Sequence, residues 1–330
     1  MNRRERIQAA LQLKETDRLP FSLWRHFPNL DHHPRKLAEL SLEYQRKFDL
    51  DFIKFTPYGM LATIDWGVKL KFFPEFDTAA VAAEPAVKAP EDWTKLRPYS
   101  GTDGEYLHAL EGLRLAMLEI PKDVPLIQTA FSPLTNAMKM SGETPLLLHM
   151  REHPEKLEKG LEVITAATIG YLKESMKRGA EGVFYSTQMS CYDKLTLEEH
   201  QRFVKKYDIE VLNALKDSTW FNVLHLHGSK VMFKECLDYP VQAINWHDQD
   251  DGPSFEEARK LSQKCFLGGL SHLRTLVQEG SEKSLEAQVA AAWSHNNHRG
   301  VILGPGCVVD PKTPEAYLRL IRDRAMATKS

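Results

Sequence analysis

The chain has few cysteines and no excess of charge. Its four cysteines, spread over 330 residues, are too few for a disulfide framework. We therefore expect a reducing, cytoplasmic location, where a cysteine serves as core filler, metal ligand or nucleophile. Lys and Arg total 43 against 45 Asp and Glu, which gives a net charge of −2. This balance argues against a nucleic-acid-binding protein and against a polybasic membrane protein.

Long apolar runs are also missing. No stretch approaches the roughly 20 apolar residues that cross a bilayer. Residues 1–18 are too densely charged to contain the apolar core of a signal peptide. We find neither a low-complexity tract nor the glycine-rich first turn that often marks a doubly wound open sheet. The composition predicts a compact cytoplasmic protein that binds neither nucleic acid nor membranes.

Short apolar runs alternate with amphipathic stretches along most of the chain. The predicted strands lie at 21–24, 52–55, 126–131, 182–186, 222–227, 243–246, 266–270 and 301–304. The predicted helices include 34–48, 105–120, 154–178, 197–216, 255–263, 284–295 and 313–324. Eight apolar strands that alternate with helices predict an α/β fold, a (β/α)8 TIM barrel in one domain over residues 1–330. A doubly wound open sheet is the alternative.

Residues 67–100 interrupt this alternation. Residues 68–73 have the pattern of a hairpin strand, and three prolines (Pro85, Pro90 and Pro98) follow within a short distance. We interpret residues 67–100 as an insertion after the second strand that caps the mouth of the barrel.

Polar residues at the ends of the predicted strands are the candidates for a functional site. In such a barrel the active site lies where the strands run into the following loops. A buried polar group there costs free energy unless it is hydrogen-bonded or binds a ligand. Loop residues, however, are usually polar whether or not they have such a role. A guanidinium at this position suits a carboxylate or phosphate of a ligand, or else pairs with an acidic neighbour. The substrate-binding candidates are Arg25, His26, Tyr58, Ser186, Gln188 and His247.

His225 and His227 are the most specific pair of candidates. Side chains two residues apart on a strand point to the same face, so both imidazoles would face the barrel interior near its mouth. Cys307 follows the last predicted strand and could join them as a third ligand with a fourth position open, as in catalytic zinc sites. Alternatively, hydrogen bonds alone satisfy the two histidines, and the cysteine is a small buried hydrophobe.

Several motifs in sequence order resemble those of the uroporphyrinogen decarboxylase superfamily. They lie at 4–11, 17–20, 24–25, 131–135 (a Pro-X-Thr loop), 197–207 and 304–314. The resemblance runs nearly end to end and implies a (β/α)8 barrel that forms a homodimer. It also implies one of two activities. One branch of the family decarboxylates a tetrapyrrole without a cofactor, and the other moves a methyl group from a corrinoid protein to a thiol at a zinc site.

The decarboxylase pattern of that family is poorly matched. The positions of its second arginine, its aspartate, its tyrosine and its Gly-His-Gly motif hold Asn29, Tyr58, Lys139 and Gly304-Pro305-Gly306. A decarboxylase would also need cations in its cavity, and Arg25 and Lys139 are the residues that we expect there.

The methyltransferase pattern is better matched. Cys307 and Thr313-Pro314 resemble its C-terminal cysteine segment, and His225 matches its histidine, but His227 stands where that branch has a cysteine. The resemblance therefore implies a zinc-dependent methyltransferase-like enzyme with its metal at His225, His227 and Cys307. Its substrate would be a small molecule and its partner a corrinoid protein. The main alternative is a cofactor-free decarboxylase of uroporphyrinogen or another carboxylated substrate, as in porphyrin biosynthesis. Metal-dependent hydrolysis and a non-catalytic ligand-binding barrel also stay open.

Overall fold

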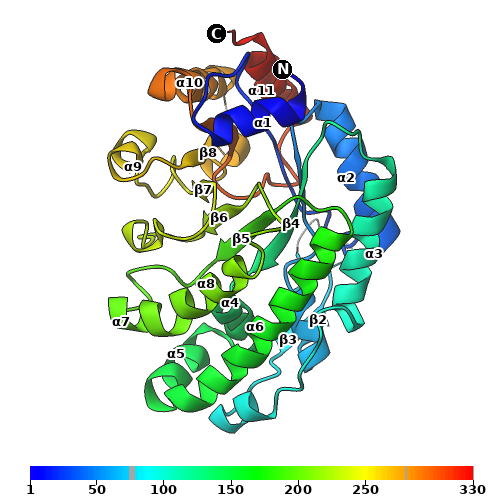
Figure 1. Ribbon diagram of the computed structural model, residues 1–330, viewed down its shortest axis with the longest axis vertical. Helices are drawn as coiled ribbons and strands as arrows, with labels where there is room; N and C mark the ends of the chain where they lie inside the picture. Colours follow the sequence, from blue (N-terminus) through cyan, green and yellow to red (C-terminus); the bar gives the residue numbers. More distant parts are fainter. Residues whose placement is uncertain (74–78, 279–280, 330) are drawn as a thin grey trace.

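The computed structural model describes residues 1–73, 79–278 and 281–329, and its centre is a curled parallel sheet (Figure 1). Seven strands pair in the order β1-β4-β5-β6-β7-β8-β9. Their bounds are β1 (Ile53–Phe55), β4 (Leu126–Phe131), β5 (Val183–Thr187), β6 (Val223–Leu226), β7 (Ala243–Trp246), β8 (Cys265–Leu270) and β9 (Val301–Pro305). All of these residues except Phe131 are buried, as expected for a parallel sheet covered on both faces.

The segment predicted as the first strand, 21–24, is not a regular strand. Only Phe21 forms a bridge, and it is parallel to Leu303 of β9. The same segment contacts both edges of the sheet. The backbone N–H of Ser22 donates to the carbonyl of Leu303, and that of Asp51, just before β1, donates to the carbonyl of Phe21, each at 3.0 Å. The segment therefore lies between β9 and β1, where it occupies the eighth position of the predicted barrel.

Helices follow most of the strands and cover the outside of the sheet (Figure 1). They are α1 (Arg3–Leu11), α2 (Pro34–Phe48), α3 (Gly104–Glu119), α4 (Pro133–Ser141), α5 (Glu143–Glu152), α6 (Pro154–Lys177), α7 (Leu197–His200), α8 (Lys206–Asn213), α9 (Phe255–Leu261), α10 (Glu282–Ser294) and α11 (Glu315–Ala327). Within the described ranges, none of these helices has the length and apolar character needed to cross a bilayer.

Helices α4 and α5 were not predicted, and the helix predicted at 197–216 is shorter and interrupted. The Pro-X-Thr segment at 131–135, expected as a loop, contains the first turn of α4. Pro133 begins that helix, where a missing N–H costs no hydrogen bond. The helix predicted at 197–216 ends at Asn213 and is divided by a π-helical turn, Gln201–Lys205, between α7 and α8.

Residues 67–100 contain the expected hairpin. β2 (Lys69–Lys71) pairs antiparallel with β3 (Val81–Glu84), whose residues are all exposed. Residues 74–78 between them lie outside the described part of the chain. The indole of Trp93 is buried against α6, where a Cβ on Gly160 would lie 2.8 Å from its ring. The role of residues 67–100 as a cap over the barrel stays a prediction.

Apolar side chains fill the barrel below its C-terminal mouth. Trp24, Phe52 and Phe184 form part of this interior cluster, and the ring centroids of Trp24 and Phe184 are 5.4 Å apart. Cys265 belongs to the same cluster, in agreement with the expectation that it is core filler. The filled interior leaves the mouth as the place where polar side chains can meet.

Candidate metal centre

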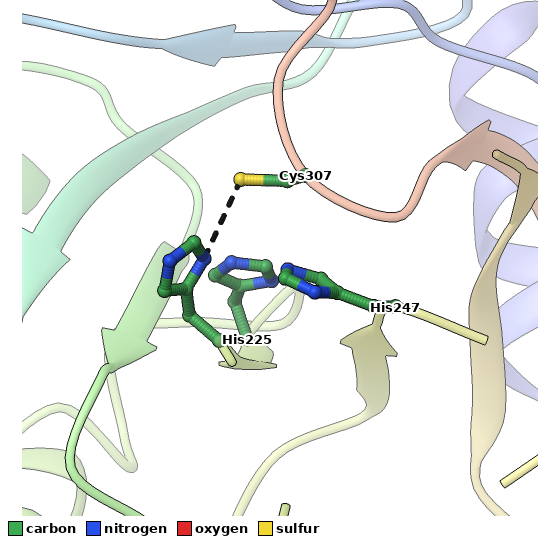
Figure 2. A group of neighbouring side chains, drawn as sticks. His225, His247 and Cys307 are labelled. Carbon is green, nitrogen blue, oxygen red and sulfur yellow. Dashed lines mark hydrogen bonds between the residues drawn. The ribbon is translucent and has the colours of Figure 1, made fainter. Parts of the chain in front are cut away.

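Four side chains from the ends of three strands meet at the mouth of the barrel. They are His225, His227, His247 and Cys307, and one ligand atom of each lies within 4.8 Å of the others. Figure 2 shows His225, His247 and Cys307 directed toward one another. The sulfur of Cys307 is 3.6 Å from Nδ1 of His227. The structure thus brings together the three residues predicted as metal ligands and adds His247, which we predicted to bind substrate.

Strand register explains the place of His247. The pairing of β6 with β7 aligns His225 with Asn245 and Leu226 with Trp246. The residues that follow these strands, His227 and His247, therefore lie side by side, with ring centroids 4.9 Å apart. Sequence analysis recognised both histidines as strand-end residues, but it could not place them next to each other because the register was unknown.

Gly306 allows Cys307 to approach the imidazoles. Its N–H donates to the carbonyl of Leu270 at the end of β8. A Cβ at this position would lie 3.1 Å from the Cα of His247 and 3.1 Å from the carbonyl oxygen of Trp246. Glycine therefore lets the chain after β9 pass close to the end of β7 before it reaches the cysteine.

Hydrogen bonds on Nδ1 orient two of the imidazoles. Nδ1 of His225 lies 2.5 Å from Oδ1 of Asn245, and Nδ1 of His247 lies 3.0 Å from Oδ2 of Asp251. Each contact leaves Nε2 as the free nitrogen of its ring. Nε2 of His247 is buried and has no hydrogen-bond partner in the described structure. This nitrogen is therefore free to act as a ligand.

Burial sets the protonation states of His225, His227 and Cys307. Burial, with the neighbouring histidines, holds the pKa of His225 well below its usual value and lowers that of His227 to about 3. Both imidazoles are therefore neutral near neutral pH, which is the form that binds metals. Burial raises the pKa of the Cys307 thiol, so without a metal this residue keeps its proton.

A cavity that opens to solvent lies beside the cluster, and its empty space, part of it open solvent, is about 480 Å³. It is lined by His225, His227, Cys307, Trp24, His26, Lys54, Thr56, Thr129, Phe131, Phe184, Ser186, Gln188 and Val308. Of the predicted substrate-binding residues, His26, Ser186 and Gln188 line this cavity, and His247 belongs to the cluster beside it.

Arg25 and Tyr58 do not line this cavity. Arg25 lines a smaller neighbouring pocket and donates to backbone carbonyls, including that of Pro311 at 3.4 Å. The hydroxyl of Tyr58 donates to Glu105 at 2.8 Å, and its ring lines another pocket. Lys139, which the decarboxylase alternative placed in the cavity, is not among its lining residues and donates to the carbonyl of Gly59 at 2.7 Å.

Lys54 and Asn245 were not among the residues predicted from the sequence. The signal for Lys54 was present, because a lysine in the middle of the apolar run 52–55 is a charge in a strand predicted to be buried. Burial lowers the pKa of Lys54 to about 7. Asn245 likewise stands out as an amide inside a buried strand, but only the register shows that it contacts His225.

Comparison with known proteins identifies the family. The family model described as uroporphyrinogen decarboxylase (URO-D) matches residues 2–326. The chain belongs to this family. Methylcobamide:CoM methyltransferase MtbA of Methanosarcina acetivorans is 22% identical over 241 residues, 71% of this chain and 67% of the relative. Uroporphyrinogen decarboxylase of Aquifex aeolicus is 29% identical over 177 residues, 51% of this chain and 49% of the relative.

Solved structures share the fold of this URO-D family member. A methyltransferase from Methanosarcina mazei superposes with a TM-score of 0.84 at 17% identity, over 99% of this chain and 100% of the other. A B12-independent methionine synthase from Shewanella sp. W3-18-1 gives a TM-score of 0.59 at 12% identity, over 93% and 94% of the two chains. At these low identities the solved structures show only a shared fold. The relatives found by sequence include both methyltransferases and decarboxylases.

Proposed function

We propose that this URO-D family member is a zinc-dependent methyltransferase-like enzyme whose metal ligands are His225, His227, His247 and Cys307, one of which would give way to a thiol substrate because tetrahedral zinc takes four ligands. The observation that carries the proposal is the approach of these four ligand atoms to within 4.8 Å of one another. Imidazole nitrogens and a thiolate are the donors that zinc prefers, in a tetrahedral arrangement. The unpartnered Nε2 of His247 is a second observation in favour of a metal.

The spacing of the donors suits zinc. Usual zinc–nitrogen and zinc–sulfur bond lengths place tetrahedral ligand atoms roughly 3.3–3.6 Å apart. The contact of 3.6 Å between Cys307 and His227 falls at this spacing. The ligand atoms lie at most 4.8 Å from one another, so those farthest apart would have to move by about 1 Å to bind one zinc ion.

The residues around the site would support this chemistry. When bound, zinc acts as a Lewis acid that lowers the pKa of a thiol or polarises an oxygen. Asn245 and Asp251 hold two of the imidazoles in place, and the rings of Trp24, Phe131 and Phe184 exclude water from part of the cavity. The names of the methylcobamide relatives favour a corrinoid protein as the methyl donor and a thiol as the acceptor.

The decarboxylase alternative receives less support from the geometry. It requires several cations in the cavity to hold a carboxylated substrate, but neither Arg25 nor Lys139 lines the cavity, and Lys54 is the one lysine or arginine in its wall. The corrinoid partner, the homodimer and the cytoplasmic location stay predictions.

Elemental analysis of protein purified without chelators tests the proposal. We expect about one zinc per chain in the native protein and none in the double variant His225→Ala/Cys307→Ala. Cys236→Ala is the matched control, because this cysteine is fully buried outside the cluster. Stoichiometric metal in the double variant, or a native protein that binds no zinc even after incubation with the ion, would contradict the proposal. Demethylation of methylcobalamin by the zinc-loaded protein with a thiol acceptor then tests the transfer itself.

A further inference from the structure

The wall of the cavity contains one lysine, Lys54 of β1, and no aspartate or glutamate. Lys54 is only 8% exposed. Its Nζ donates to Oγ1 of Thr56 at 3.1 Å and lies 4.6 Å from the centre of the Phe184 ring. The described residues include no carboxylate within ion-pair distance of this ammonium. A buried ammonium without an opposite charge is costly, and burial accordingly lowers the pKa of Lys54 to about 7. A bound anion would offset this cost and hold the amine in its charged form.

The strand fixes the direction of the Lys54 side chain. Ile53 and Phe55, its neighbours on β1, pack among residues of the surrounding helices in a separate apolar cluster. Because side chains alternate along a strand, Lys54 and Thr56 both point into the barrel. Lys54 is therefore directed into the cavity and away from the helices around the barrel.

Lys54 also acts on the metal-ligand cluster. Burial is the largest cause of the lowered pKa of His225, and the positive charge of Lys54 lowers it further. Burial raises the pKa of Cys307, and the charge of Lys54 opposes this rise. Lys54, His225, His227 and Cys307 line the same cavity, so one small molecule in it could contact both the ammonium and the cluster.

We propose that Lys54 binds the anionic group of a small acid, such as a carboxylate, whose other end lies at the cluster of His225, His227, His247 and Cys307. The second half of this inference rests on the proposed function. An ammonium is the natural partner of an anion, and charge-assisted hydrogen bonds are stronger than neutral ones. The remaining polar side chains of this wall, among them Ser186 and Gln188, can donate hydrogen bonds and carry no negative charge to repel such a ligand.

Two thiols that differ in the charge of the tail test the inference. Binding of 3-mercaptopropionate and of 2-mercaptoethanol to the zinc-loaded protein is measured by isothermal titration calorimetry. We expect the anionic thiol to bind at least about tenfold more tightly than the neutral one. In Lys54→Met this preference should disappear while the zinc content stays unchanged, and Lys54→Arg should keep part of it. Lys139→Met is the matched control, because this second partly buried lysine does not line the cavity.

The outcomes separate this inference from the proposed function. Equal binding of both thiols by the native protein, or a preference that persists in Lys54→Met, overturns the inference even if zinc is bound. If Lys54→Met does not fold, Lys54→Gln replaces it. Propionate, which has no thiol, is titrated into the metal-free variant His225→Ala/Cys307→Ala with and without Lys54→Met. Lys54-dependent binding of propionate there supports the anion site even if the proposed function fails.

Discussion

Nδ1 of His225 lies 2.5 Å from Oδ1 of Asn245, and this contact decides which nitrogen of His225 is available to a ligand. The amide nitrogen of Asn245 donates to the carbonyls of Leu267 and Pro305, at 2.6 and 3.1 Å. The amide oxygen must therefore accept the proton of Nδ1, which leaves Nε2 as an electron-pair donor. Asn245 is a positioning residue, and its own orientation depends on the backbone of β8 and β9.

Replacement of Asn245 should weaken metal binding without removing a ligand. Asn245→Leu keeps the size of the side chain but loses the acceptor, so we expect zinc affinity to fall by about 10–100-fold. Competition with a chromophoric chelator measures this affinity. Asn136→Leu, on α4, is the control, because Asn136 lines a different pocket. Unchanged affinity in Asn245→Leu would show that this hydrogen bond does not orient His225.

Replacement of His247 tests whether this residue is a metal ligand or a substrate-binding residue. If it is a ligand, His247→Ala should lower zinc affinity by about tenfold or more and change the visible absorption of the cobalt-substituted protein, which reports coordination number. His26→Ala, in the wall of the same cavity but outside the ligand set, should leave both unchanged. A variant His247→Ala that retains its metal affinity and spectrum but binds the thiol more weakly would favour the substrate-binding role predicted from the sequence.

Gly306→Ala should disturb both stability and the metal site. The added Cβ would lie 3.1 Å from backbone atoms of Trp246 and His247, which can move only if the ends of β7 and β9 separate. We expect a loss of about 1–3 kcal/mol in the free energy of unfolding, measured with urea, and a lower zinc content. Gly59→Ala is the control, because its Cβ would meet no atom closer than 3.9 Å. Native-like stability and zinc content in Gly306→Ala would contradict the packing argument.

His200 should make the stability of the protein depend on pH. It is fully buried, with Nε2 3.2 Å from Oγ of Ser190, and burial lowers its pKa to about 4. The unfolded chain takes up this proton near pH 6.5, so stability falls as the pH falls from about 6.5 toward 4.

The size of this effect can be isolated with one variant. Between about pH 7 and pH 5 the native protein should lose about 2 kcal/mol more unfolding free energy than His200→Gln, which cannot be protonated in this range. Urea unfolding at the two pH values measures the difference. Equal losses in the two proteins would show that His200 is not protonated on unfolding in this range.

The local sequence was sufficient for most of the fold. Each of the seven strands of the barrel sheet overlaps a predicted apolar run, and α2 has the predicted bounds, because apolar periodicity and proline positions act within a few residues of the chain. The spacing of His225 and His227 also predicted that they would face the same way, and the place of Cys307 at the end of a strand predicted that it would reach the mouth.

Tertiary structure decided which polar groups meet. The register of β6 against β7 brings His247 beside His227 and Asn245 beside His225, and no local pattern specifies a register between separate strands. The same holds for Arg25 and Tyr58, whose side chains turn to Pro311 and Glu105 instead of the cavity. Burial along a strand follows from its own sequence, whereas a site at the barrel mouth depends on loop paths and strand offsets set by the packing of the whole chain.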